Sequence, residues 1–135
     1  YLTSNFERIH AIGTDISESA QEFPLSFVWD FHERKAEWVN SFDFVYSNSL
    51  DQAWNPKKAI TSWLEQINSS GTVIIELTVN HGPEGASVMD PFGVRPIAFP
   101  YVLSDWFGDE LKLSHSVEKK SNMDLEAWLF FISKV

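Results

Sequence analysis

The sequence predicts an α/β fold in which a mostly parallel sheet ends in an antiparallel C-terminal hairpin. Two observations lead to this prediction. Short, nearly continuous apolar runs follow one another along the chain, and such runs are typical of strands covered on both faces. An amphipathic helical segment separates two of these runs, which predicts a strand–helix–strand unit with parallel strands. At 135 residues, the chain has the size of one domain, and we expect a single domain over 1–135.

Four apolar runs predict the strands of the parallel part. They are rich in Val, Ile and Phe, which favour strands. Polar side chains stand where the first three runs end: Asp15 closes the first, Asp30 follows the second, and Ser47 and Asn48 end the third. The four predicted strands lie at residues 9–16, 25–29, 42–49 and 71–79.

The clearest helix is predicted at residues 55–68, NPKKAITSWLEQIN. Asn55 is a favourable N-cap residue, and Pro56 suits the first helical position. Gly71 then permits a turn into the next strand. The apolar side chains that share one helical face are Ala59, Ile60, Trp63, Leu64 and Ile67.

The last third of the chain has a different pattern. Residues 80–100 are rich in Gly and Pro and predict a long loop, and residues 101–108 predict a short helix. Two further strands are expected at 111–119 and 125–135, joined by the polar turn KSNMD. This arrangement predicts an antiparallel pair at a sheet edge.

Composition excludes several classes of function. Ten basic and nineteen acidic residues give a net charge of −9, which disfavours binding to nucleic acid or to anionic membranes. The absence of cysteine excludes disulfides, thiolate metal sites and a cysteine nucleophile. No apolar run approaches the roughly 20 residues that span a bilayer, and no signal-peptide pattern is present. We therefore expect a cytoplasmic protein without nucleic-acid or membrane partners.

The order of these elements resembles the class I S-adenosylmethionine-dependent methyltransferases, over residues 6–135. The resemblance implies a Rossmann-like three-layer sandwich with an antiparallel C-terminal hairpin. Gln52 departs from the family pattern, because many members carry His there. The most specific part is the segment 42–76, where the matching residues are Asp43, Val45, Asn48, Leu50, Pro56 and Gly71.

The family's first strand and its glycine-rich turn have no counterpart in the sequence. Residues 1–17 resemble the end of the first family helix running into the second strand, and Gly13 lies inside that strand. The chain therefore resembles an N-terminally truncated methyltransferase domain. The missing strand is central in the family sheet, so we expect an apolar trough with unpaired backbone groups, each costing about 1–3 kcal/mol. The chain must close this gap, form a homodimer through it, or pair with another segment.

The resemblance also implies a cofactor site at the carboxyl ends of the strands, where open α/β sheets bind ligands. Asp15, flanked by Ile16, would accept hydrogen bonds from the ribose hydroxyls of S-adenosylmethionine. Asp30 and Phe31 would contact the adenine. Small polar side chains at Ser47 and Asn48 would leave room for the sulfonium and the acceptor.

Each of these residues also has a purely structural interpretation. Asp15 can cap the segment that follows it, and Asp30 can be a solvated turn residue. Ser47 and Asn48 are equally compatible with an ordinary strand-to-loop transition. Glu76 interrupts an apolar strand, so it must be paired, lie near the pocket or point outward. His81 can serve as a base or simply be a solvated loop residue.

The function expected from the sequence is a methyltransferase-like domain that acts on a small-molecule acceptor. Methyl transfer depends mainly on positioning, so the sequence identifies no catalytic residue. The four histidines show no i, i+4 pairing, and we predict no metal site. Without the glycine-rich turn, we expect S-adenosylmethionine to bind weakly or not at all. The alternatives are a non-catalytic module for protein association and a nicotinamide-dependent oxidoreductase, although the latter lacks any G-x-G-x-x-G sequence.

Overall fold

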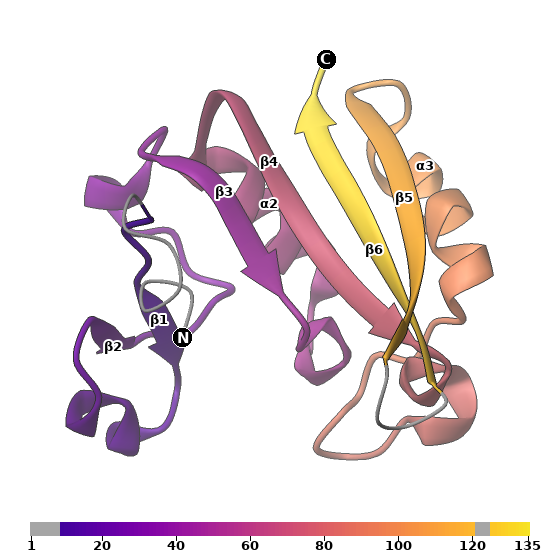
Figure 1. The fold of residues 1–135 in the computed structure, drawn as a ribbon, viewed down its shortest axis with the longest axis horizontal. Coiled ribbons are helices and arrows are strands. Elements are labelled where there is room, and N and C mark those ends of the chain that lie inside the picture. Colours follow the sequence, from indigo (N-terminus) through magenta and orange to yellow (C-terminus); the bar gives the residue numbers. More distant parts are fainter. Residues whose placement is uncertain (1–8, 121–124) are drawn as a thin grey trace.

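The strands form two separate sheets in the computed structural model, which describes residues 9–120 and 125–135 (Figure 1). The smaller sheet pairs β1 (Gly13–Asp15) with β2 (Ser26–Val28) in parallel. The larger sheet has the order β3-β4-β6-β5. Its strands are β3 (Phe42–Ser47), β4 (Ile67–Thr78), β5 (Leu111–Lys120) and β6 (Leu125–Lys134).

Two α-helices and several short 3₁₀ helices connect these strands. The α-helices are α2 (Pro56–Gln66) and α3 (Phe99–Phe107). The 3₁₀ helices are η1 (Glu18–Glu22), η2 (Ala36–Trp38), η3 (Leu50–Gln52), η4 (Val79–His81), η5 (Pro83–Gly85) and η6 (Pro96–Ala98).

The directions of the strands confirm the predicted α/β fold. β3 and β4 are parallel and α2 connects them, while β6 is antiparallel to both β4 and β5. The predicted C-terminal hairpin is therefore present as the β5–β6 pair. Most of the turn that was predicted to join these strands, residues 121–124, lies outside the described residues.

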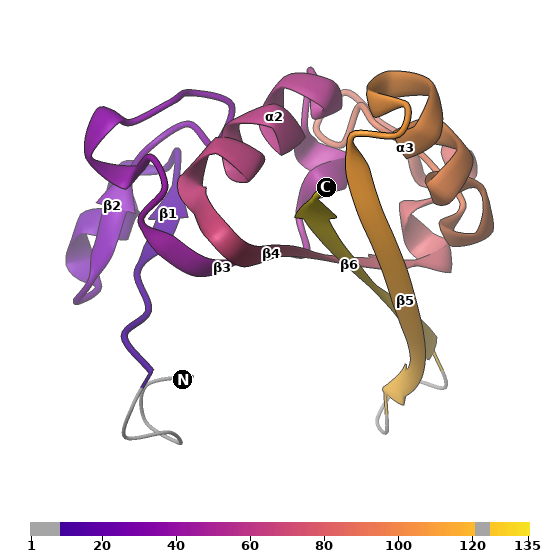
Figure 2. The ribbon, with the colours of Figure 1, turned by 90° about the horizontal axis from the view of Figure 1, so that it is seen from above.

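Both α-helices cover the same face of the larger sheet (Figure 2). The opposite face carries no α-helix among residues 9–120 and 125–135, so this part of the chain has two layers where a three-layer arrangement was expected. Strand side chains alternate between the faces, which places Val45 toward the helices and Phe44 and Tyr46 on the open face. Phe44 and Tyr46 are both exposed.

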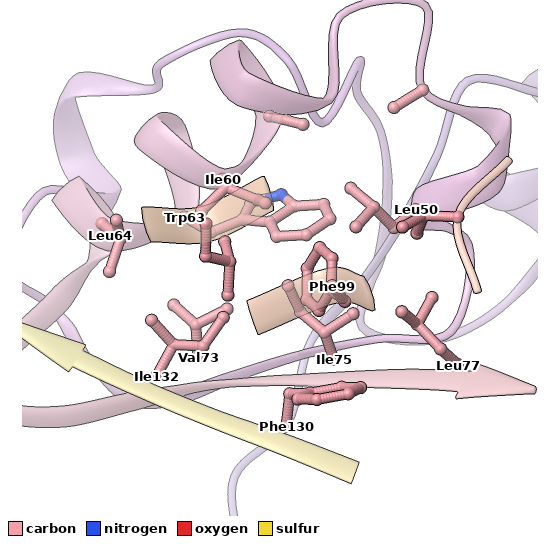
Figure 3. Close-up of a cluster of buried hydrophobic side chains, with 14 of the residues drawn as sticks. Leu50, Ile60, Trp63, Leu64, Val73, Ile75, Leu77, Phe99, Phe130 and Ile132 are labelled. Atoms are coloured by element: carbon pink, nitrogen blue, oxygen red, sulfur yellow. The ribbon is translucent and has the colours of Figure 1, made fainter. Parts of the chain in front are cut away.

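The hydrophobic core lies between the helices and the larger sheet (Figure 3). The rings of Phe99 from α3 and Phe130 from β6 meet edge to face, with centroids 5.0 Å apart. The fully buried large side chains are Leu50, Ile60, Ile67, Val73, Ile75, Leu77, Phe99, Phe130 and Ile132.

Helix α2 begins as the sequence predicts. The side chain of Asn55 accepts a hydrogen bond from the Lys58 amide at 3.0 Å, and Pro56 occupies the first helical position. Ala59, Ile60 and Trp63 are buried against the sheet. Capping and one-sided burial together fix the helix over the β3–β4 pair.

Strand β4 begins four residues before the predicted start at residue 71. Its pairing with β3 shifts between Phe42↔Ile67 and Phe44↔Thr72, so the intervening residues form an irregular extension of the strand. Gly71 lies in this extension. A Cβ atom at residue 71 would be 2.7 Å from the Cβ of Ile67 and 3.0 Å from the carbonyl oxygen of Phe42. The predicted turn glycine is therefore a close-approach glycine within a strand.

Strand β1 is much shorter than the predicted strand at residues 9–16, and within the described part of the chain it pairs with β2 alone. Its three residues are exposed and pair with β2. The described residues supply no strand between β1 and β3, and Figure 1 shows the two sheets standing apart at this point. The expected gap in the sheet is therefore present.

Candidate functional site

A cavity of about 970 Å³ lies between β1 and β3; we call it the trough. Thr14 of β1 contributes to one wall, and Phe44 and Tyr46 of β3 contribute to the other. Aromatic side chains from the intervening segments, including Trp29 and Trp38, complete the lining. The trough lies next to the predicted site residues.

Asp15 lies at the carboxyl end of β1. Its Oδ1 atom accepts a hydrogen bond of 2.7 Å from the Ser17 amide, and Ser17 in turn caps η1. The structural interpretation of Asp15 thus holds in part, since the carboxylate supports the turn before η1. A carboxylate has further acceptor positions, and Asp15 and the adjacent Ile16 are both exposed to solvent.

Asp30 follows β2 and forms a compact unit with His32. Its Oδ1 atom accepts from the His32 amide at 2.9 Å and lies 2.7 Å from Nδ1 of the His32 ring. Nε2 of this ring accepts from the Asn55 amide at 3.4 Å, so the neutral tautomer carries its proton on Nδ1. Within residues 9–120 and 125–135, both hydrogen bonds to Asp30 end on Oδ1, which leaves Oδ2 for another donor.

The electrostatic balance at Asp30 favours the ionised carboxylate. Partial burial acts to raise the pKa of Asp30, but the hydrogen bonds from the amide and ring of His32 outweigh it, helped by the charge of Lys58. The pKa of Asp30 therefore lies below its ordinary value. The carboxylate is ionised at neutral pH, as hydrogen-bond acceptance from a ligand would require.

Phe31 is half-buried and packs against the core. The ring centroid of His32 lies 4.6 Å away, and the ring of Trp63 meets Phe31 edge on at 5.6 Å. Phe31 also lines the trough. Neighbouring rings thus already occupy part of the aromatic surface that was predicted for adenine.

Ser47 and Asn48 end β3 and line the trough. The Ser47 hydroxyl accepts from the Ser49 amide at 3.2 Å, and the Ser49 hydroxyl donates to Oδ1 of Asn48 at 3.1 Å. These local bonds are those of a strand-to-loop transition. They nevertheless leave short polar groups at the mouth of the trough.

The six predicted site residues fall into two groups. Phe31, Ser47 and Asn48 line the trough, whereas Asp15, Ile16 and Asp30 lie outside its lining. The two acids are nevertheless neighbours in the sheet, because Asp15 pairs with Val28 in the parallel β1–β2 ladder. Both carboxylates therefore follow adjacent parallel strands at the same edge.

His32 was not predicted to take part in the site. It is 3% exposed, and Trp54 stacks on its ring with centroids 4.5 Å apart. A histidine two residues after an acid in WDFHE was the available indication, because such spacing suits a local side-chain bond. His32 ties Asp30 to the start of α2.

Two other polar residues acquire definite partners. The hydroxyl of Tyr46 donates to Oε2 of Glu76 at 2.8 Å, so the buried acid is paired. Nδ1 of His81 accepts from the Thr78 amide at 3.2 Å, and its Nε2 lies 3.9 Å from Oδ2 of Asp51. The lone pair on Nδ1 of His81 already accepts the Thr78 amide, so it is not free to take a proton as a base would.

Within the described part of the chain, no three His, Cys, Asp or Glu side chains are arranged to hold a metal ion. No helix of residues 9–120 and 125–135 has the length and apolar character needed to cross a bilayer.

The sequence matches no family model and no curated protein, but the fold is similar to solved structures. LepI in complex with SAM (S-adenosylmethionine) is 13% identical at a TM-score of 0.67, over 99% of this chain and 39% of that one. A structure described as a pericyclic reaction enzyme gives the same values. A TehB-like SAM-dependent methyltransferase from Corynebacterium glutamicum is 15% identical at a TM-score of 0.58, over 92% of this chain and 67% of that one.

These likenesses confirm the predicted Rossmann-like fold. At 13–15% identity, they show the fold and do not transfer residue roles. This chain spans about two fifths of the length of LepI.

Proposed function

We propose that the chain is part of an S-adenosylmethionine-dependent methyltransferase-like domain that acts on a small-molecule acceptor. The observation that best supports this is the placement of Asp15 and Asp30. The two acids follow adjacent parallel strands at one edge of the sheet, beside a cavity of about 970 Å³. Ligands of open α/β sheets bind at this edge.

The residues present partly fit the cofactor. Asp15 is exposed and retains acceptor positions for ribose hydroxyls, and Oδ2 of Asp30 can accept from the adenine amino group. Ser47 and Asn48 would border the reacting end. The cofactor itself would supply the activated methyl group, so the role of the protein is to orient the acceptor.

A fold alone does not determine a reaction, and one similar structure is described as a pericyclic reaction enzyme. The second candidate is a non-catalytic module for protein association. Among the residues that the structure describes, β1 and β3 each have one edge without a partner strand. These edges favour the module, because open strand edges pair readily with other chains.

A titration with S-adenosylhomocysteine, followed by amide NMR shifts, tests the proposal. We expect weak, saturable binding at millimolar concentration, with shifts at Asp15, Asp30 and Ser47. Asp15→Asn should weaken binding about tenfold, because a neutral amide is a poorer partner for two hydroxyls. Asp109→Asn, at an exposed residue elsewhere, is the matched control.

One outcome would count against the proposed function, and another would count only against the expected weak affinity. If amide shifts at these residues are absent at a ligand concentration of about 5 mM, roughly a 5–10-fold excess over the protein, the association module would be favoured. Micromolar affinity by calorimetry would show that the described strands suffice for tight binding, contrary to our expectation for a sheet without its central strand.

A further inference from the structure

We propose that Phe27, Trp29 and Trp38 form an aromatic cage that binds the methylated ammonium group of a small organic cation. The ammonium of Lys35 lies over all three rings and occupies the cage. The ligand would replace this side chain, so Lys35 is a competitor built into the chain. The inference is independent of the proposed function, since it depends on three rings and on no cofactor.

The three rings converge on one point. Nζ of Lys35 lies 4.9 Å from the ring centroid of Phe27 and 5.4 Å from that of Trp29. The centroid of Trp38 is nearest, at 4.5 Å. The ring of Trp38 is inclined at 75° to that of Phe27 and at 65° to that of Trp29. The rings therefore form walls in different directions, each within the roughly 6 Å over which a ring face attracts a cation.

Short-range structure builds the cage. Phe27 and Trp29 are two residues apart in the segment that begins with β2, so their side chains extend from the same face. The indole N–H of Trp29 donates to the Glu33 carbonyl at 2.9 Å, which orients this ring. Trp38 is the last residue of η2, and Lys35 is its N-cap residue. Residues 27–38 thus supply both the rings and the cation.

The contacts of Lys35 explain why a methylated cation suits the cage better than a lysine ammonium. Within residues 9–120 and 125–135, Lys35 forms no ion pair with a carboxylate. A primary ammonium is strongly hydrated and has three N–H donors, for which ring faces are poor acceptors. Methyl groups on the nitrogen remove these donors and keep the charge, and aromatic cages are typical sites for quaternary ammonium groups. Without an ion pair, the Lys35 side chain can also leave the cage readily.

The surroundings of the cage favour a cationic ligand. Trp29 and Trp38 belong both to the cage and to the lining of the trough. Among the described lining residues, Asp43 is the single acid, and Lys and Arg are absent. Residues 9–43 carry seven acidic and two basic residues, a net charge of −5. Such a charge attracts a small cation and repels an anion.

A titration with choline at constant ionic strength tests the site, with the indole N–H signals of Trp29 and Trp38 in NMR spectra as the readout. The control ligand is the neutral alcohol in which a carbon atom replaces the nitrogen of choline. We expect choline to cause saturable shifts of both signals and the alcohol to bind at least tenfold more weakly. Lys35→Ala should tighten choline binding about tenfold, because the cage is then always open. Lys112→Ala, at an exposed lysine of β5, should leave the affinity unchanged.

A ring substitution locates the effect. Phe27→Leu removes one wall at a side chain that is 40% exposed, and Phe23→Leu, at a side chain that is 64% exposed, is its matched control. Phe27→Leu should weaken choline binding at least threefold in both the wild-type and the Lys35→Ala chain, whereas Phe23→Leu should not change it.

Three results would overturn the proposal. The first is equal affinity for choline and for the neutral alcohol, since the charge would then contribute nothing. The second is a Lys35→Ala chain that binds choline no more tightly than the wild type. The third is a choline titration whose shifts are confined to indoles other than those of Trp29 and Trp38.

Discussion

The hydroxyl of Tyr46 donates a 2.8 Å hydrogen bond to Oε2 of Glu76, which links β3 to β4 on the face that α2 and α3 leave open. Glu76 is buried in an otherwise apolar strand. Burial, together with this bond and the charge of Glu76, raises the pKa of Tyr46 to about 12. This hydrogen bond explains how Glu76 is accommodated in an apolar strand, because Tyr46 is its partner.

Tyr46→Phe should lower the free energy of unfolding by about 1–2 kcal/mol at neutral pH, because Glu76 loses one of its donors. The raised pKa of Tyr46 adds a pH dependence. The folded state holds this proton more tightly, so the stabilisation is complete below about pH 10 and is lost as the pH rises to about 12. Urea unfolding between pH 8 and 12 measures both effects.

The exposed Tyr101 provides a matched control for this experiment. Tyr101→Phe should leave stability and its alkaline slope unchanged. An alkaline slope that persists in Tyr46→Phe would contradict the assignment.

Asp30→Asn should lower stability at pH 6 by about 1 kcal/mol, after allowance for the partial exposure of the carboxylate. The depressed pKa of Asp30 means that its ionised form stabilises the fold above the unfolded pKa, near 3.8. This contribution is lost as the pH falls through the folded value. The variant should therefore show a flatter acid limb in unfolding curves between pH 2 and 5. Asp109→Asn, at an exposed position, should keep the wild-type limb.

Gly71→Ala should destabilise the fold by about 1–3 kcal/mol, since the added Cβ would overlap the Cβ of Ile67 and the Phe42 carbonyl. Denaturant midpoints compare it with Ser70→Ala at the exposed neighbouring position. Equal midpoints for the two variants would show that the extension of β4 can shift to accommodate the methyl group.

Phe130→Ala should lower stability by about 3–5 kcal/mol, because it removes a fully buried ring that packs on Phe99. Val88→Ala, at a side chain that is 97% exposed, should stay within about 0.5 kcal/mol of the wild type. Calorimetric unfolding distinguishes the two. A loss below about 1 kcal/mol for Phe130→Ala would indicate that the core between β6 and α3 collapses to fill the space.

Much of the fold could be predicted from local patterns. The N-cap at Asn55, the apolar face of α2 and the turn at Gly108, which has a φ of 56°, are encoded over a few residues. The length of β1 could not be predicted in this way, because an apolar run shows strand propensity but not whether a neighbour exists. The start of β4 at Ile67 was missed because its first four residues, rich in Asn and Ser, lack a strand pattern.

The candidate site was predictable in position but not in detail. The acids at strand ends identified the ligand edge, since parallel strands end together. The spacing in WDFHE indicates the local bond between His32 and Asp30, but the stacking of Trp54 on His32 could not be predicted, because that contact depends on the path from β2 to α2. The ring packing of Phe31 depends on the same path.

The antiparallel course of β6 determines where Val135 lies in the fold. Ile132 pairs with Val73 near the start of β4, and the amide of Val135 donates to the Glu110 carbonyl at 3.0 Å. Val135 is thus anchored at the opposite end of the larger sheet from Ser47. A dye, an affinity tag or a biosensor surface coupled through Val135 would leave the ligand edge unobstructed, whereas coupling through the β3–α2 loop would not.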